Sequence, residues 1–119
     1  MSETSIQSRQ SEPFAHNADV EWEDLGDGIK RKILTFEGKV MMAKIAFEAG
    51  AIGVAHSHPH IQCSYVESGE FWLTIDGRRE KLVSGDSFLV APDLMHDAVA
   101  ITDGVLIDVF TPMREDFLP

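Results

Sequence analysis

Three histidines and one glutamine, carried by two short stretches that each begin with glycine, have the residue types of a single metal site. They are His56, His58, Gln62 and His96. Neutral imidazole nitrogen is a common ligand for Zn, Ni, Cu and Fe, and an amide oxygen can complete the coordination shell. Three imidazoles and an amide leave the full charge on a divalent ion, which favours polarising a substrate oxygen or holding an anionic ligand. The sequence therefore predicts a divalent metal site, and Ni, Zn, Mn, Fe and Co are all compatible with it.

Strand geometry accounts for the spacing of these residues. Side chains two residues apart on a strand project to the same side, so His56 and His58 can bind one ion together. Pro59 cannot donate to a strand ladder, so we expect the chain to turn there and to re-enter as the strand that carries Gln62. His96 follows the turn sequence PDLM and is expected to supply the fourth ligand from a neighbouring strand.

Short apolar segments alternate with glycine-containing turns along most of the chain, at roughly the eight- to twelve-residue spacing of all-β domains. The segments between the turns predict strands at 29–36, 39–47, 52–58, 61–67, 70–75, 79–83, 87–91, 96–101 and 105–110. The clearest hairpin contains Asp76-Gly77, which suits a type I′ turn. No segment keeps a helical apolar period for three turns, and the tail after Pro112 has room for one helical turn at most. These patterns indicate one small antiparallel β domain.

The charge balance excludes two classes of partner. The chain carries 20 acidic and 10 basic residues, for a formal net charge of −10. Such a surface repels nucleic acid and anionic membranes, so neither is an expected partner. No apolar run approaches the length of a bilayer span, and the N-terminal residues lack the apolar core of a signal peptide, so we expect a cytoplasmic protein. An anionic small molecule stays compatible, because a metal and an arginine can outweigh the overall field inside a cleft.

The chain length of 119 residues suits one domain with its own core. Residues 1–13 are polar and unpatterned and are predicted to form a flexible segment, with the domain over residues 14–119. The single cysteine, Cys63, excludes an intrachain disulfide. Strand alternation points Cys63 away from the side that Gln62 uses, which favours a packed, inert thiol over a ligand or a nucleophile.

The two metal-binding stretches resemble the two sequence motifs of the cupin superfamily. The first motif, G-x5-H-x-H-x3,4-E-x6-G, is matched with Gln62 in the position of the glutamate. In the second motif, G-x5-P-x-G-x2-H-x3-N, Gly85 and His96 match, whereas the other three positions hold Ala91, Asp93 and Ala100. These departures affect the turn and the strand end and leave the ligand in place. The resemblance implies an all-β fold, the double-stranded β-helix or jelly roll of the cupin barrel, with the metal inside it and a homodimer as the usual assembly.

A narrower resemblance, to small cupins of the KdgF type, extends from about Val20 to Leu118. Its most specific part is the C-terminal block D-x-F-x3-R-E-D-F, and Ile61, where many relatives carry Glu, is a local departure. Proteins of this type open the ring of 4,5-unsaturated uronates that polysaccharide lyases release from pectin or alginate, which gives open-chain 4-deoxy keto-uronates. The resemblance implies that His56, His58, Gln62 and His96 hold the metal. It also implies three catalytic-site residues, which are Asp108, Phe110 and Arg114.

The residues of the C-terminal block support this placement. Asp108 and Phe110 share one side of the last predicted strand, so an acid and an aromatic ring face the same space. A carboxylate in an apolar strand is costly unless it has a partner, and either a metal cavity or a structural pairing with a backbone or arginine group would supply one. The planar guanidinium of Arg114 suits a uronate carboxylate, although it could equally be a solvated arginine paired with Glu115 or Asp116. Phe110 would be a wall for the sugar ring or a core residue.

Other functions stay open at this stage. Another metal-dependent cupin enzyme, such as an Fe(II) dioxygenase or an isomerase, would use the same ligands. A non-catalytic cupin that binds a small molecule would need no acid–base group beside the metal. The expected partners are therefore an anionic sugar and a second copy of the chain, with Trp22, Trp72 and Tyr65 as candidate interface residues. His16 and His60 are expected to be surface residues or satisfied core residues.

Overall fold

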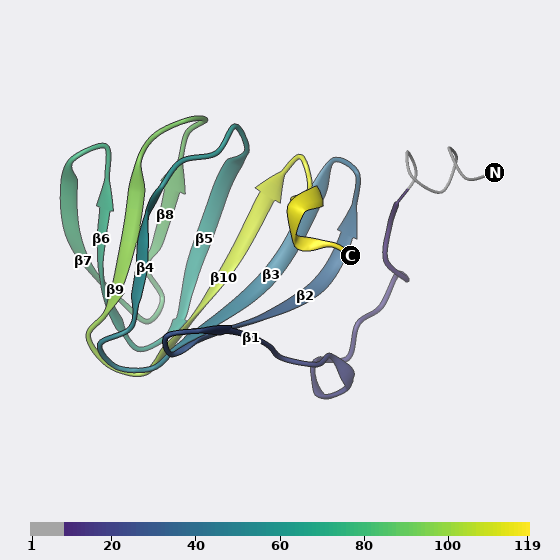
Figure 1. The fold of residues 1–119 in the computed structure, drawn as a ribbon, viewed down its shortest axis with the longest axis horizontal. Coiled ribbons are helices and arrows are strands. Elements are labelled where there is room, and N and C mark those ends of the chain that lie inside the picture. The colour runs from purple at the N-terminus through teal and green to yellow at the C-terminus, as the bar shows by residue number, and fades with distance from the viewer. Residues whose placement is uncertain (1–8) are drawn as a thin grey trace.

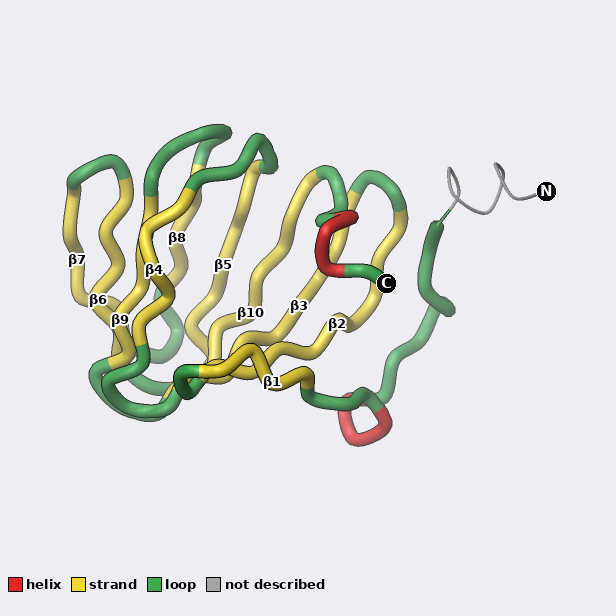
Figure 2. The backbone as a smooth tube through the Cα atoms, in the orientation of Figure 1, coloured by secondary structure: helices red, strands yellow, loops and turns green. Residues whose placement is uncertain are grey.

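Two antiparallel sheets face each other across the interior of the molecule (Figures 1 and 2). The structure is a computed structural model that describes residues 9–119. One sheet has the strand order β1-β2-β3-β10-β5-β8 and the other has the order β4-β9-β6-β7. The strands are β1 Glu23–Gly26, β2 Ile29–Glu37, β3 Val40–Phe47, β4 Ile52–His56, β5 Ile61–Ser68, β6 Glu70–Ile75, β7 Arg78–Val83, β8 Ser87–Val90, β9 His96–Ala100 and β10 Gly104–Thr111.

The predicted all-β jelly roll is confirmed, and every predicted strand is present in this order. In the predicted hairpin, Asp76 and Gly77 have φ angles of 49° and 82°, and they join paired strands β6 and β7 as a type I′ turn requires. The single helical turn after Pro112 is the 3-10 helix η2, Glu115–Phe117. Strand β1 was not predicted, because its four residues are all exposed and so carry no apolar alternation.

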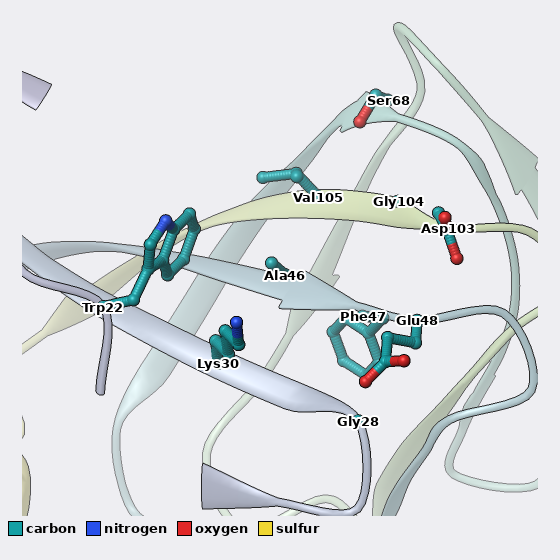
Figure 3. Close-up of a pocket in the computed structure, with 10 residues that line it drawn as sticks. All are labelled: Trp22, Gly28, Lys30, Ala46, Phe47, Glu48, Ser68, Asp103, Gly104 and Val105. Carbon is teal, nitrogen blue, oxygen red and sulfur yellow. The ribbon is translucent and has the colours of Figure 1, made fainter. Parts of the chain in front are cut away.

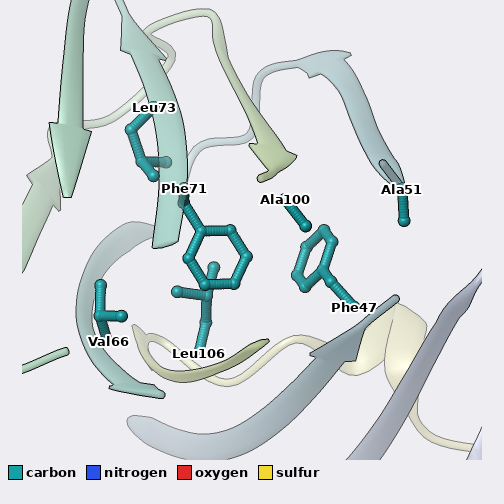
Figure 4. Close-up of a cluster of buried hydrophobic side chains, with 7 residues drawn as sticks. All are labelled: Phe47, Ala51, Val66, Phe71, Leu73, Ala100 and Leu106. Carbon is teal, nitrogen blue, oxygen red and sulfur yellow. The ribbon is translucent and has the colours of Figure 1, made fainter. Parts of the chain in front are cut away.

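The hydrophobic core lies between the sheets (Figure 4), near the ends of β3, β5 and β9 and the starts of β6 and β10. The six-stranded sheet contributes Phe47, Val66 and Leu106, and the rings of Phe47 and Phe71 pack edge to face with their centroids 5.2 Å apart. Burying each large apolar side chain contributes about 1.5–3 kcal/mol. Strands β5, β9 and β10 supply core residues from one end and, as described below, polar residues from the other. The packed end therefore holds the strands that position the site.

The N-terminal residues of the described range lie against β2. The backbone N–H of Ser11 donates to the carbonyl of Phe36, and the Lys32 ammonium donates to the carbonyl of Asn17 in the 3-10 helix η1, Asn17–Asp19. Most of the predicted flexible segment, residues 1–8, lies outside the described residues, and the domain boundary at Phe14 stays a prediction. Over residues 9–119, none of the helices has the length and apolarity to cross a membrane.

Candidate metal centre and substrate cavity

The three predicted histidine ligands lie together at the end of the molecule opposite the hydrophobic core. His56 ends β4 and His96 begins β9, and these two residues are paired in the sheet. One ring nitrogen from each of His56, His58 and His96 lies within 4.8 Å of the others, so this triad could hold a metal ion. The predicted strand 52–58 is too long, because β4 stops at His56. His58 therefore reaches the site from the loop before Pro59 and not from the same strand as His56.

The backbone leaves one nitrogen of each ring free for a metal. In every case Nδ1 lies against a carbonyl two residues away, at 2.9 Å for His56 and His96 and 3.1 Å for His58. The three carbonyls belong to Val54, Leu94 and His60. A carbonyl only accepts hydrogen bonds, so these contacts favour the tautomer with the proton on Nδ1, in which Nε2 of a neutral ring keeps its lone pair. This is the orientation that metal-binding histidines normally adopt.

The buried nitrogen of His96 provides a test of whether a metal fits. Nε2 of His96 is buried and has no hydrogen-bond partner within residues 9–119. Burial lowers the pKa of the ring, which keeps it neutral with a free lone pair. An unsatisfied buried acceptor costs about 1–3 kcal/mol, and a divalent cation would satisfy it. The donor set and this unpaired atom therefore fit the implied metal.

Gln62 also directs an acceptor at the triad. Its Oε1 lies 3.0 Å from Nε2 of His58, and both side chains are buried. A neutral His58 ring has one N–H, and when Nδ1 donates it to the His60 carbonyl, Nε2 of His58 and Oε1 of Gln62 are both acceptors with no hydrogen bond between them. Two facing acceptors are the arrangement that a cation between them would require. The predicted role of Gln62 as a ligand stays a prediction that this geometry suits.

Asp108 lies on the inner face of β10, one strand away from Gln62. In the register of β5 and β10, Ser64 is opposite Asp108 and Gln62 is opposite Phe110. The Ser64 hydroxyl donates to Oδ1 of Asp108 at 2.6 Å, so the carboxylate has a serine partner in place of the backbone or arginine pairing considered above. Burial raises the pKa of Asp108 to about 6, which the hydrogen bond from Ser64, the charge of Arg114 and the nearby amide of Gln62 partly oppose.

These residues surround a cavity of about 240 Å³ that extends from the triad toward the C-terminal tail. Its lining includes all the predicted site residues except His58, which lies behind Phe110 with the ring centroids 5.8 Å apart. Phe110 is therefore both a cavity wall and a buried residue, with 2% of its surface exposed. The structure brings the predicted ligands and the predicted catalytic residues into one space.

Arg114 reaches this cavity from the tail. Its guanidinium donates two hydrogen bonds to Asp116, at 3.0 and 2.8 Å, and these bonds lower the pKa of that carboxyl. It also lies 4.2 Å from the ring centroid of Phe117 and 5.0 Å from that of Phe110. The predicted pairing with Asp116 is thus present, but the arginine side chain is only 11% exposed and lines the cavity. It is not a solvated surface arginine.

The sequence reasoning missed Arg31, Phe117 and Ser64. The Arg31 guanidinium lies 3.9 Å from the Phe117 centroid and lines the cavity, so two arginines contact the same ring. Arg31 lies two residues from both Ile29 and Ile33 on β2, and residues two apart on a strand share one face. This spacing indicates that the charged residue faces inward with the two isoleucines. Ser64 follows Gln62 by two residues, which places both on the inner face of β5.

Two other expectations need correction. Cys63 points away from Gln62 as predicted, but it is exposed on the outer face of the sheet and is not packed. His60 is not a fully satisfied residue, because its Nδ1 is buried without a partner among the described residues. Burial and the nearby charge of Arg114 lower the pKa of His60, whose carbonyl holds the ring of His58.

A larger hollow of about 390 Å³ lies near the core end of the molecule (Figure 3). Its lining contains no histidine or cysteine, and the side chains shown include Trp22, Lys30 and Asp103. Asp103 accepts a hydrogen bond from the backbone N–H of Ala49 at 2.7 Å, which gives it a structural role. The chemistry-bearing residues are concentrated in the smaller cavity.

Comparisons with known proteins agree with the fold. The family described as "Cupin domain" matches residues 43–110. The chain is 46% identical over 99 residues to the pectin degradation protein KdgF of Dickeya dadantii (strain 3937), which covers 82% of this chain and 90% of that protein. This chain is a cupin.

Solved cupin structures have the same architecture. An RmlC-like cupin from Shewanella frigidimarina NCIMB 400 is 48% identical, with a TM-score of 0.91 over 92% of this cupin and 99% of that chain. KdgF from Halomonas sp. is 36% identical, with a TM-score of 0.87 over 91% of this cupin and 100% of that chain. The predicted resemblance to the KdgF type is therefore confirmed.

Proposed function

We propose that this cupin opens the ring of 4,5-unsaturated uronate monosaccharides, as a step in the breakdown of pectin or alginate. Asp108 is the proposed general acid–base, and His56, His58, Gln62 and His96 are the proposed metal ligands. The observation that carries the proposal is a buried carboxyl group that shares an arginine-lined cavity with a histidine triad. The 46% identity to a protein named for pectin degradation supports the substrate class.

The reaction needs only the movement of a proton and the cleavage of one ring bond. A proton leaves the hydroxyl on C1, the bond from C1 to the ring oxygen breaks, and a proton adds to C4 as C5 becomes a ketone. The open-chain keto-uronate has the same composition as the substrate, so no oxidant or reductant takes part. A bound divalent cation would supply Lewis-acid polarisation of a substrate oxygen.

The environment of Asp108 suits such a proton transfer. A general acid–base works best when its pKa lies near the operating pH, and the pKa of about 6 allows this carboxyl both to accept and to release a proton near neutrality. Ser64 occupies Oδ1, and we assign the second carboxylate oxygen to the substrate. The apolar walls of the cavity restrict water around the reacting atoms.

The charges in the cavity suit an anionic sugar. The protein as a whole has a net charge of −10, whereas the cavity lining includes Arg31 and Arg114. Their guanidinium groups pair with Glu23 and Asp116 and would exchange these partners for the substrate. Arginine binds carboxylates through parallel N–H donors, and the Phe110 ring offers an apolar surface to the sugar. We therefore assign the uronate carboxylate to the two arginines and the sugar ring to the space beside Asp108.

The test of the function is the rate of loss of unsaturated-uronate absorbance when the metal-loaded protein is added to the products of a pectate or alginate lyase. We expect a clear acceleration over the spontaneous rate, with no dissolved oxygen consumed. Oxygen uptake in an electrode would point to a dioxygenase instead. Binding of the uronate with no acceleration would point to a non-catalytic cupin, and either result would reject the proposal.

Arg31 provides a separate prediction about substrate binding. Replacing Arg31 with Gln is expected to raise KM for the unsaturated uronate by about 10- to 150-fold, because a charge-assisted hydrogen bond contributes about 1.5–3 kcal/mol. The value of kcat should change less, since Arg31 is not assigned to the proton transfer. Steady-state kinetics over a range of substrate concentrations separate the two effects.

The matched control is Lys30→Gln, which removes the positive charge of the adjacent, exposed residue of β2. KM should be unchanged in this variant. An equal rise in KM for both variants would show that Arg31 acts only through the overall charge of the protein.

The remaining parts of the proposal concern assembly and location. A homodimer is supported by an apolar row on the outer face of the six-stranded sheet, where Met42, Val109, Cys63 and Leu89 are neighbours across four strands. Trp22 and Tyr65 are also exposed, whereas Trp72 is partly buried beneath Arg79. The cytoplasmic location stays a prediction.

A further inference from the structure

We propose that Ser64 is a positioning residue that makes Gln62 present its amide oxygen, and not its amide nitrogen, to the metal. The proposal rests on the role of Gln62 as a ligand in the proposed function. A glutamine amide has an acceptor end and a donor end of nearly the same shape, so its side chain alone does not decide which end faces the triad. Only the oxygen can bind a cation.

The sheet brings Gln62, Ser64 and Asp108 into contact, and these three residues form a hydrogen-bonded relay. Gln62 and Ser64 are two residues apart on β5 and share its inner face, and Ser64 is directly opposite Asp108 on β10. The amide Nε2 of Gln62 lies 3.0 Å from the Ser64 hydroxyl, which lies 2.6 Å from Oδ1 of Asp108. The same amide directs Oε1 at Nε2 of His58, 3.0 Å away.

The single hydroxyl proton of Ser64 determines the direction of its hydrogen bonds with Asp108 and Gln62. An ionised carboxylate only accepts hydrogen bonds, so when Asp108 is ionised the single proton of the Ser64 hydroxyl is directed at its Oδ1, 2.6 Å away. The hydroxyl then has only lone pairs to offer to Gln62, which must present its N–H groups on that side. The oxygen of the amide is left to face the histidines. Asp108 thus orients a metal ligand through the hydroxyl of Ser64.

Because the three side chains are buried, water cannot easily replace the hydrogen bonds between them. Ser64 is 2% exposed, Gln62 is 6% exposed and Asp108 is 7% exposed, so bulk water does not compete for these groups. The relay also accounts for glutamine at position 62. A glutamate at position 62 would place a second carboxylate beside the Ser64 hydroxyl. The single hydroxyl proton can be donated to only one of the two carboxylates.

The test measures Co²⁺ binding by apo protein, through the visible absorption of the bound ion. Ser64→Ala is expected to weaken Co²⁺ binding by about 10- to 100-fold, the usual effect of removing a group that orients a metal ligand. Ser64→Thr keeps the hydroxyl and should restore most of the affinity. The matched control is Ser87→Ala, the same change on the exposed face of neighbouring strand β8, which should leave the affinity unchanged.

A double-mutant cycle distinguishes this role from a general effect on folding. Once Gln62→Ala has removed the ligand, adding Ser64→Ala should change Co²⁺ affinity by no more than about twofold, because the hydroxyl has nothing left to orient. An equal loss in both backgrounds, or unchanged binding by Ser64→Ala alone, would overturn the proposal. Neither readout involves a sugar, so failure of the ring-opening reaction would leave the result for Ser64 intact.

Discussion

Replacement of Asp108 by asparagine is expected to lower kcat for ring opening by about 10²–10⁴-fold, the usual contribution of a general acid–base. Asparagine has nearly the shape of aspartate and can still accept the Ser64 hydrogen bond, but it cannot take up and release a proton. Bound metal should be unchanged, which elemental analysis of the purified variant would measure. A variant that keeps its activity, or one that has lost its metal, would reject the assigned role.

The same substitution should stabilise the metal-free protein near neutral pH. The folded-state pKa of Asp108 is raised to about 6 from the ordinary aspartate value of 3.8, so between these two pH values the folded protein holds a proton that the unfolded chain has lost. Stability therefore falls as pH rises through this interval, by at most roughly 3 kcal/mol above it. Asparagine removes this penalty. Urea unfolding should show a gain for Asp108→Asn at pH 7 that shrinks toward pH 4, and a gain independent of pH would contradict the assignment.

Removal of a histidine ligand has the second large expected effect. His96→Ala should weaken metal binding by more than about 100-fold, because it deletes a buried ring nitrogen that has no other partner in the described chain. This loss exceeds the roughly 10- to 100-fold effect of removing a residue that only hydrogen-bonds to a metal ligand. Excess metal should raise the melting temperature of the unchanged protein, because an ion that binds only the folded state stabilises it. The variant should show no such shift.

His16→Ala is the control for this experiment, since His16 is an exposed histidine of the N-terminal region with no side-chain cap bond to η1. Its metal content and its melting response should equal those of the unchanged protein. Full metal occupancy in His96→Ala at the same metal concentration would show that the triad is not the binding site.

Much of the fold and of the site follows from simple periodicity. Strands β5 and β10 alternate strictly between inward and outward residues, so the shared face of Gln62 and Ser64 and that of Asp108 and Phe110 can be read from the sequence. Asp76-Gly77 identifies its hairpin because few other residue pairs adopt two positive φ angles. The spacing of the histidines predicted the triad that the structure brings together, and Gln62 stays a predicted ligand.

Other features depend on tertiary contacts that no local pattern carries. The end of β4 is one example, since His58 belongs to a loop although its spacing from His56 also suits a strand. The pairing of β1 with β2 depends on exposed residues without apolar alternation, including the Arg31–Glu23 ion pair at 2.9 Å. The shared contact of Arg31 and Arg114 with Phe117 joins residues more than eighty positions apart. Only the folded chain brings these groups together.

The division of the cavity between strands and tail has an evolutionary consequence. The histidines and Gln62 belong to β4, β5, β9 and the loop after β4, whereas Arg114 and Phe117 belong to the segment after β10. Under the proposed function, mutations in that short segment would change which anion binds without disturbing the proposed metal ligands. Selection can therefore act on substrate preference and on metal chemistry as two separable traits encoded in different parts of the gene.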